Sequence, residues 1–199
     1  MRIIGLLGGV ASGKSSVAQH FAGLGAGILD ADRAAHEALR LPRVESAVRQ
    51  RWGAEVFGPD GRIDRPRLAR LVFAGASPGL EEREYLESLI HPEVGRMLQR
   101  EAGQMAASGR AAAILDAPLL LEAGWDRFCD SLVFVEVPRE LRLCRAKARG
   151  WSEEEFAARE GAQESLDLKR ARADLVLDNS GSPEETRRQV ERYWPCLIG

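Results

Sequence analysis

The sequence of 199 residues predicts an α/β fold in which a five-stranded parallel sheet lies between two layers of helices. Five short apolar runs predict the strands, because each is nearly continuous, as in strands buried on both faces. Helical or loop sequence separates the runs, as right-handed crossovers require. Apolar residues make up 45% and charged residues 29%, the balance of an ordinary globular chain. The runs are 3–7, 27–29, 111–115, 132–137 and 175–177.

Charge and cysteine content exclude several classes of protein. A formal charge of -2 provides no overall positive field, so neither nucleic acid nor a membrane is expected as a partner. The three cysteines, Cys129, Cys144 and Cys196, have no Cys-x-x-Cys spacing, which argues against a disulfide framework or a zinc knuckle. No apolar stretch is long enough for a signal peptide or a membrane span. We therefore expect a cytoplasmic protein. A monomer is expected, with an oligomer as the alternative.

The first predicted strand leads into a phosphate-binding loop of the form Gly-x-x-x-x-Gly-Lys-Ser, from Gly8 to Ser15. Glycines let successive backbone N–H groups face a phosphate, and the helix beginning near Lys14 aims its positive end at the same anion. Lys14 would bridge the β- and γ-phosphates, and the Ser15 hydroxyl would ligate Mg²⁺. The predicted ATP-binding residues here are Gly9, Val10, Ala11, Ser12, Gly13, Lys14, Ser15 and Ser16.

Two acids follow the second strand, in Asp30-Ala31-Asp32. The carboxyl edge of a parallel sheet is where ligands bind, so these acids are expected beside the phosphate loop. A carboxylate there can orient an acceptor hydroxyl and take its proton late in phosphoryl transfer. Asp32 is therefore predicted to be the catalytic base, although acids in this position also serve as helix N-caps.

About 80 residues separate the second and third strands, far more than one crossover helix requires. We predict a helical insertion within a single domain, at about 36–107, and a core formed by about 1–35, 108–148 and 173–199. Prolines lie at or near the ends of the predicted helical stretches of the insertion. These stretches are 43–52, 65–73, 80–90 and 93–107.

Asp116 ends the third strand, where an acid could hold Mg²⁺ directly or through water. An end-of-strand cap or ion pair is the alternative for this residue. Pro118-Leu119-Leu120-Leu121-Glu122 follows and is predicted to open a short helix under the substrate site.

A charged segment at about 149–172 is predicted to be a mobile lid, and Ser152 followed by three glutamates is predicted to start a helix in it. Arg145 and Arg149 are four residues apart and would share one helix face, and Arg159 and Gln163 have the same spacing. Arginines on a closing lid neutralise charge on the transferred phosphoryl group. A solvated surface helix is the alternative. Together with the phosphate loop, these arginines favour a kinase over a regulatory GTPase.

These residues together resemble the dephospho-coenzyme A kinase family, almost from end to end. The resemblance rests on the phosphate loop combined, in this order, with Asp-Ala-Asp, His91-Pro92, Pro118-Leu119-Leu120 with Glu122, and Asp178-Asn179 with Gly181. Leu68, Phe73, Arg145, Arg159, Gln163, Lys169 and Ala173-Asp174 also match.

The resemblance implies a three-layer nucleotide-kinase core, a helical coenzyme A domain and a lid, and phosphorylation of the ribose 3′-hydroxyl of dephospho-coenzyme A by ATP with Mg²⁺. It implies that Asn179 and Gly181 lie by the adenine, and that Arg145 and Arg149 contact the ATP phosphates, Arg145 with a catalytic role beside Lys14 and Asp32. The implied substrate-binding residues are Asp32, His91, Pro118, Leu119, Leu120, Glu122, Arg159 and Gln163.

Ala11 and Ser16 depart from the family, which usually has Gly and Thr there. Ala11 is acceptable only if its position does not need a positive φ. Another small-molecule or nucleoside monophosphate kinase of the same fold is one alternative, although the long insertion argues against it. A non-catalytic nucleotide-dependent switch is the other.

Overall fold

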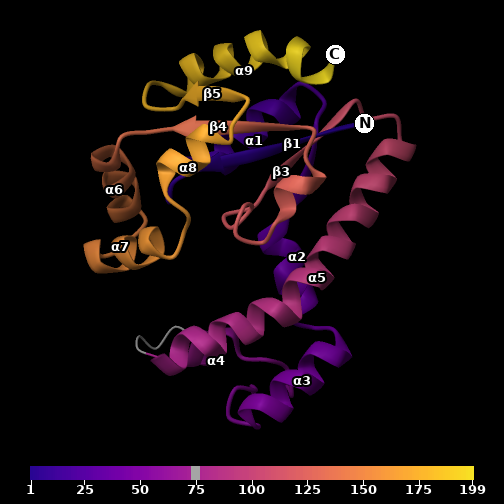
Figure 1. The fold of residues 1–199 in the computed structure, drawn as a ribbon, viewed down its shortest axis with the longest axis vertical. Helices are drawn as coiled ribbons and strands as arrows, with labels where there is room; N and C mark the ends of the chain where they lie inside the picture. Colours follow the sequence, from indigo (N-terminus) through magenta and orange to yellow (C-terminus); the bar gives the residue numbers. More distant parts are fainter. Residues whose placement is uncertain (73–76) are drawn as a thin grey trace. The chain divides into compact units, whose positions relative to one another are not determined.

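The computed structural model describes residues 1–72 and 77–199, which form two compact units. The first unit comprises Met1–Ala31 and Arg100–Gly199, and the second comprises Asp32–Gln99. Figure 1 shows the elements of both. Phe73, predicted to end a helix, lies outside the described residues.

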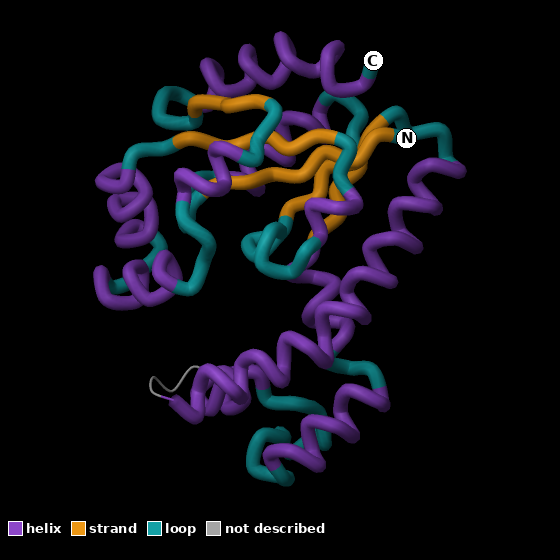
Figure 2. The backbone as a smooth tube through the Cα atoms, in the orientation of Figure 1, coloured by secondary structure: helices purple, strands orange, loops and turns teal. Residues whose placement is uncertain are grey.

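The first unit is built on one parallel sheet of five strands, in the order β2-β3-β1-β4-β5 (Figure 2). This confirms the predicted sheet, with strand ends within two residues of the predicted ones. Ile4, Leu6, Ile114 and Val133 have no exposed surface, because helices cover both faces. The strands are β1 (Arg2–Gly8), β2 (Gly27–Asp30), β3 (Ala112–Asp116), β4 (Ser131–Glu136) and β5 (Leu175–Asp178).

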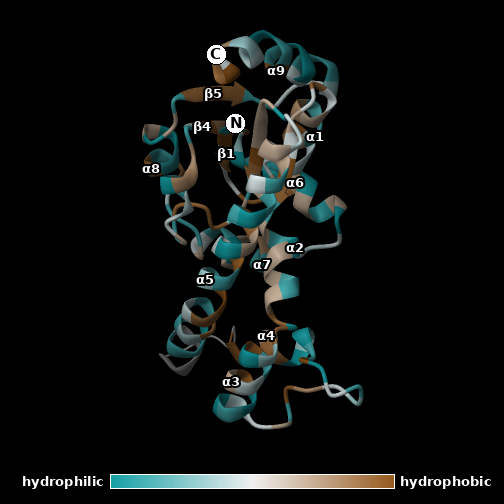
Figure 3. Ribbon diagram, turned by 90° about the vertical axis from the view of Figure 1, so that its right-hand side faces the viewer, coloured by the Kyte–Doolittle hydropathy of each residue, from teal (hydrophilic) through white to brown (hydrophobic). Residues whose placement is uncertain are grey.

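Two helices of this unit pack against each other over the sheet, α1 (Lys14–Gly23) and α9 (Pro183–Ile198). Phe21 of α1 lies 5.9 Å from Trp194 of α9, between ring centroids. In Figure 3 the strands are largely brown and the outer surface of α9 is teal, as expected for a helix with one face on the core. The remaining helices are α6 (Arg139–Ala148), α7 (Glu153–Gly161), α8 (Leu166–Ala171) and a 3-10 turn, η1 (Trp125–Phe128).

The second unit is helical and has its own core. Val44, Val48 and Trp52 of α3 pack with Leu68 and Val72 of α4. The indole Nε1 of Trp52 donates to Glu82 at 2.6 Å, and Arg51 binds the same carboxylate at 2.8 Å. The helices are α2 (Ala31–Ala38), α3 (Pro42–Trp52), α4 (Arg65–Val72) and α5 (Ser77–Ala107), of which α2 and α5 continue into the first unit.

Two local predictions are wrong. The stretches 80–90 and 93–107 are one helix, α5, because Pro92 interrupts the hydrogen-bond ladder without ending the helix. Residues 118–124 form consecutive turns rather than a helix, closed by bonds such as that from the Trp125 N–H to the Leu120 carbonyl at 2.9 Å. Among the described residues, no helix is both long and apolar enough to cross a membrane.

Candidate functional site

The phosphate loop lies between the central strand β1 and the start of α1, where its sequence predicted it. Gly13 has a φ of 86°, a conformation that glycine adopts without steric cost. Ala11 has a φ of 58°, and it is the one non-glycine residue with positive φ in the part of the chain that the structure describes. The sequence makes Ala11 acceptable only if its position does not need a positive φ, and the structure shows that it does. Alanine adopts this conformation at a cost of roughly 1 kcal/mol. The loop holds a strained residue.

Side chains from distant segments fix the loop at the carbonyl of Ser12. The amide Nδ2 of Asn179 donates to this oxygen at 2.7 Å, and a guanidinium nitrogen of Arg145 donates to it at 3.3 Å. Arg145 also binds the carbonyl of Asn179 at 2.8 Å, and Thr186 of α9 donates to the Asn179 side chain at 2.8 Å. Asn179 and Arg145 thus brace the loop together.

This bracing has a consequence for anion binding. In a trans peptide the C=O and the following N–H point in opposite directions. Because the Ser12 carbonyl is held on one side, the Gly13 N–H is directed to the other. The N–H groups in the first turn of α1 point out of the N-terminal end of that helix, where its dipole is positive. Lys14 completes the arrangement, since its Nζ lies 3.2 Å from the Gly8 carbonyl and 3.3 Å from the Gly9 carbonyl. The loop is preorganised for a phosphate.

Two acids lie at the carboxyl edge of the sheet. Asp30 ends β2, Asp116 ends β3, and the two are paired in register. Asp116 is level with Leu6 of the adjacent β1, two residues before the phosphate loop begins. Ser15 is exposed in the first turn of α1. The described residues contain no cluster of three His, Cys, Asp or Glu side chains able to hold a metal. Mg²⁺ needs no such cluster, because it binds one or two protein oxygens together with phosphates and water.

A buried network links the turn after β3 to α8. The Nζ of Lys169, a residue only 1% exposed, lies 3.1 Å from Glu122 and 3.2 Å from Gln163. The Glu164 N–H donates to the same oxygen of Glu122 at 2.7 Å. The other carboxylate oxygen of Glu122 is buried and has no hydrogen-bond partner among the described residues. Lys169 is engaged here in bracing the segment that was predicted to be a lid.

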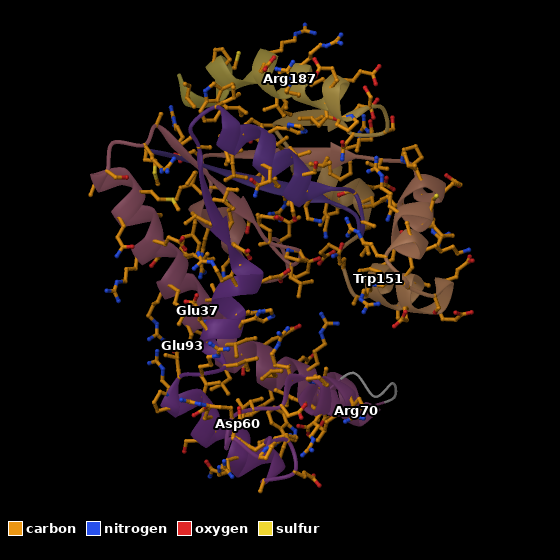
Figure 4. The ribbon with its side chains drawn as sticks, turned by 180° about the vertical axis from the view of Figure 1, so that it is seen from behind. Glu37, Asp60, Arg70, Glu93, Trp151 and Arg187 are labelled. Atoms are coloured by element: carbon orange, nitrogen blue, oxygen red, sulfur yellow. The ribbon has the colours of Figure 1, made fainter. Side chains whose placement is uncertain are left out.

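The other residues predicted in this segment have different surroundings. The predicted helix start is confirmed, because Ser152 and Glu155 form a capping box. The guanidinium carbon of Arg159 lies 4.0 Å from the ring centroid of Trp151, between α6 and α7 (Figure 4). Gln163 follows the end of α7 at Gly161, so it does not share a helix with Arg159. Arg149 is exposed at the C-cap of α6, one residue beyond the helix that carries Arg145.

The predicted substrate residues fall in both units. In the first, Pro118 and Leu119 are half-buried, whereas Leu120 is 1% exposed and lies close to Gly5 of β1, so it belongs to the core. In the second unit, Asp32 is exposed in the first turn of α2, and His91 is half-buried in α5. Burial lowers the pKa of His91, with a smaller opposing effect from Glu87. The approach of Asp32 and His91 to the phosphate loop stays a prediction.

Two features of the first unit were not predicted. Arg142, on α6, is 2% exposed and contacts the phosphate loop. Its spacing of three residues from Arg145 could have revealed it, because residues three apart share a helix face. A cavity of about 530 Å³ also lies beside Gly181, lined in addition by Asp178, Ser180, Glu185, Arg188 and Gln189.

Comparisons with known proteins agree on one family. The family model described as dephospho-CoA kinase matches residues 2–185. A dephospho-CoA kinase of Symbiobacterium thermophilum is 46% identical over 100% of this chain and 82% of its own length. The dephospho-CoA kinase of Bacillus licheniformis is 39% identical over 96% of this chain and 94% of its own length.

Solved structures support the same fold. A crystal structure from Thermus thermophilus has a TM-score of 0.83 and 39% identity, and the match covers 100% of this chain and 98% of that one. A shikimate kinase from Acinetobacter baumannii, at 15% identity and a TM-score of 0.52 over 100% of this chain and 93% of its own, shares the fold alone.

Proposed function

The chain belongs to the dephospho-CoA kinase family, and we propose that it transfers the γ-phosphate of ATP to the ribose 3′-hydroxyl of dephospho-coenzyme A. The products are coenzyme A and ADP. The observation that carries the proposal is the way the phosphate loop is held. Asn179 and Arg145 bind the Ser12 carbonyl, so the N–H groups of the loop are directed away from these two side chains.

On the nucleotide, the loop from Gly9 to Ser16 binds the phosphates. Lys14 neutralises charge between the β- and γ-phosphates, and Arg145 lies close enough to the loop to act on the same groups. Arg149 approaches from the end of α6. The adenine lies near Asn179 and Gly181, beside the cavity that Gly181 lines. Asn179 contributes mainly through the loop that it braces, because its side-chain nitrogen and oxygen are both engaged.

Ser15 and Asp116 would hold Mg²⁺, Ser15 through its hydroxyl and Asp116 directly or through water. Both are oxygen donors, and Asp116 lies at the carboxyl edge of the strand next to β1. When bound, the ion draws charge from the β- and γ-phosphates and helps to align them.

On the acceptor, Asp32 orients the 3′-hydroxyl and takes its proton as the phosphoryl group is transferred. His91, Pro118, Leu119, Glu122, Arg159 and Gln163 contribute to acceptor binding. The second unit contains a cavity of about 510 Å³ with a mainly apolar lining that includes Leu39, Leu68 and Leu86, together with His36 and Arg65. An apolar cavity with a few polar groups suits the pantetheine arm of the acceptor.

The first test measures ADP release with ATP, Mg²⁺ and one of three acceptors, namely dephospho-coenzyme A, adenosine monophosphate or shikimate, or with none. We expect release with dephospho-coenzyme A alone. Release with another acceptor would favour a different kinase of this fold, and ATP binding without acceptor-dependent release would favour a nucleotide-dependent switch.

The role of Asp32 is tested by Asp32→Asn. We expect kcat to fall by about 10²- to 10⁴-fold, the usual contribution of a general base, with the dissociation constant for ATP nearly unchanged. Asp60→Asn is the matched control, because Asp60 lies in an exposed turn of the same unit, where it accepts a hydrogen bond from the Arg62 N–H at 3.1 Å. Unchanged turnover in Asp32→Asn would remove Asp32 as the base.

A further inference from the structure

Arg142 is a buried arginine whose three guanidinium nitrogens bind three different segments of the first unit. Nε donates to the Val137 carbonyl just after β4 at 3.3 Å, and Nη1 donates to the Val10 carbonyl of the phosphate loop at 3.3 Å. Nη2 lies 2.8 Å from a carboxylate oxygen of Glu160 on α7. An arginine used only for solubility would not be buried in this way, because a buried guanidinium is desolvated and needs fixed partners.

The bond to Val10 constrains the next peptide. The Val10 C=O and the Ala11 N–H belong to one peptide plane and point in opposite directions, so a guanidinium that holds the carbonyl also sets the direction of the N–H. Ala11 is also the residue with a φ of 58°. Strained backbone persists only where the surroundings hold it in place. The hydrogen bond from Arg142 to Val10 therefore lies next to the strained residue Ala11, where it can hold the strained conformation in place.

The surroundings of Arg142 leave little freedom. A Cβ placed on Gly9 would lie 2.7 Å from Nη1, so the loop backbone passes directly against the guanidinium. Val10 packs with Phe156 and Ala146, which belong to α7 and α6, and the guanidinium carbon lies 5.6 Å from the Phe156 ring centroid. The carboxylate of Glu160 is shared with Arg139, whose Nε lies 2.9 Å away. Two arginines thus hold Glu160, but Arg142 alone of the two also has a hydrogen bond to the loop.

We propose that Arg142 is a positioning residue for nucleotide binding, which fixes the Val10–Ala11 peptide with its N–H toward the phosphates, while Glu160 holds its guanidinium. The proposal rests on the proposed use of this loop for ATP. It makes α7 part of the structure that shapes the phosphate site, through a charged pair rather than through contact with the ligand.

The test compares Arg142→Lys with Arg139→Lys. Both keep the positive charge beside Glu160, but a lysine has one nitrogen and cannot bind the three partners of Arg142. Titration calorimetry with ADP should show binding weakened about tenfold in Arg142→Lys, as for the loss of one hydrogen bond to a charged group, and within about twofold of the natural protein in Arg139→Lys. The KM for ATP should rise in parallel, with the KM for the acceptor unchanged.

Hydrogen exchange of the loop amides gives a readout that does not depend on nucleotide. Exchange across residues 8–14 should accelerate in Arg142→Lys and not in Arg139→Lys. Equal ADP affinity in a folded Arg142→Lys protein, or equal losses in both variants, would overturn the proposal. If Arg142→Lys does not fold, Glu160→Gln replaces it: faster loop exchange with weaker ADP binding supports the proposal, and unchanged loop exchange overturns it. Failure of the natural protein to bind ADP would instead refute the proposed function.

Discussion

At the scale of single residues, Gly13 meets two separate demands. Its φ of 86° lies in the left-handed region, where a side chain adds strain. A Cβ at this position would also lie 2.5 Å from Nδ2 of Asn179, the nitrogen that holds the Ser12 carbonyl. The fixed glycine of the motif is therefore needed for the approach of Asn179 as well as for its backbone conformation.

Gly13→Ala and Gly25→Ala separate these demands. Gly25 has a φ of 98° but has open space around it, so Gly25→Ala should lower the free energy of unfolding by about 1–2 kcal/mol through strain alone. Gly13→Ala should cost about 1 kcal/mol more, because the Asn179 bond is lost, and should also weaken ADP binding. Urea unfolding and calorimetry measure the two effects. Equal behaviour of the two variants would show that the approach of Asn179 is unimportant.

At the scale of elements, α5 shows how far a local signal can mislead. Proline usually ends a helix, yet α5 continues through Pro92, with helical residues on both sides of it. The proline lacks the N–H that would bond to the Ser88 carbonyl, and its ring is exposed, so little packing offsets that loss. The helix therefore carries a defect that should be measurable.

Replacing Pro92 with alanine should raise the free energy of unfolding by about 1–3 kcal/mol, because the missing hydrogen bond is restored and the clash with the preceding turn is relieved. Pro195→Ala is the control, since Pro195 lies in the last turn of α9, which ends at Ile198, where helices fray. Thermal and urea unfolding measure both variants. A neutral or destabilising Pro92→Ala would mean that the backbone geometry imposed by the proline is needed for packing.

How much the sequence could predict depended on whether the signal was local. The phosphate loop and the helix start at Ser152 were predicted correctly, because the residue types that signal each of them lie within a few positions of one another. The spacing of Arg142 from Arg145 indicates a shared helix face, but its contact with Val10, 132 residues away in the chain, could not be predicted from any local pattern. The burial of Leu120 and the pairing of Lys169 with Glu122 likewise depend on tertiary packing, which no local pattern encodes.

At the scale of the whole molecule, the half-buried His91 should make stability depend on pH. Burial lowers the pKa of His91 below its ordinary value of 6.5, while the nearby Glu87 raises this pKa and Arg83 lowers it, both by less than burial does. The unfolded chain then binds a proton more readily than the folded one. The contribution of His91 to the free energy of unfolding is therefore fully present above about pH 6.5. It is lost as the pH falls through the lowered pKa of the folded state, and the total loss is about 1.4 kcal/mol per unit of pKa difference.

Urea unfolding at pH 7.5 and pH 5.5 tests this effect. The natural protein should lose more stability between the two pH values than His91→Gln, in which the titrating group is absent. An identical loss in both proteins would assign the pH dependence to other groups.

The strand order has a further consequence, for biosynthesis. β1 is the first strand in the chain and lies at the centre of the sheet, but both of its neighbours come much later in the sequence. Ile4 pairs with Ile114 on one side and with Ser131 on the other. On the ribosome, this apolar strand and the phosphate loop that follows it emerge long before either neighbour has been translated. They must remain unpaired while more than half of the chain is made, so an apolar segment able to aggregate stays exposed during synthesis. The phosphate loop gains the brace from Asn179 only after β5 has been added, near the end of translation, so we expect nucleotide to bind at that stage.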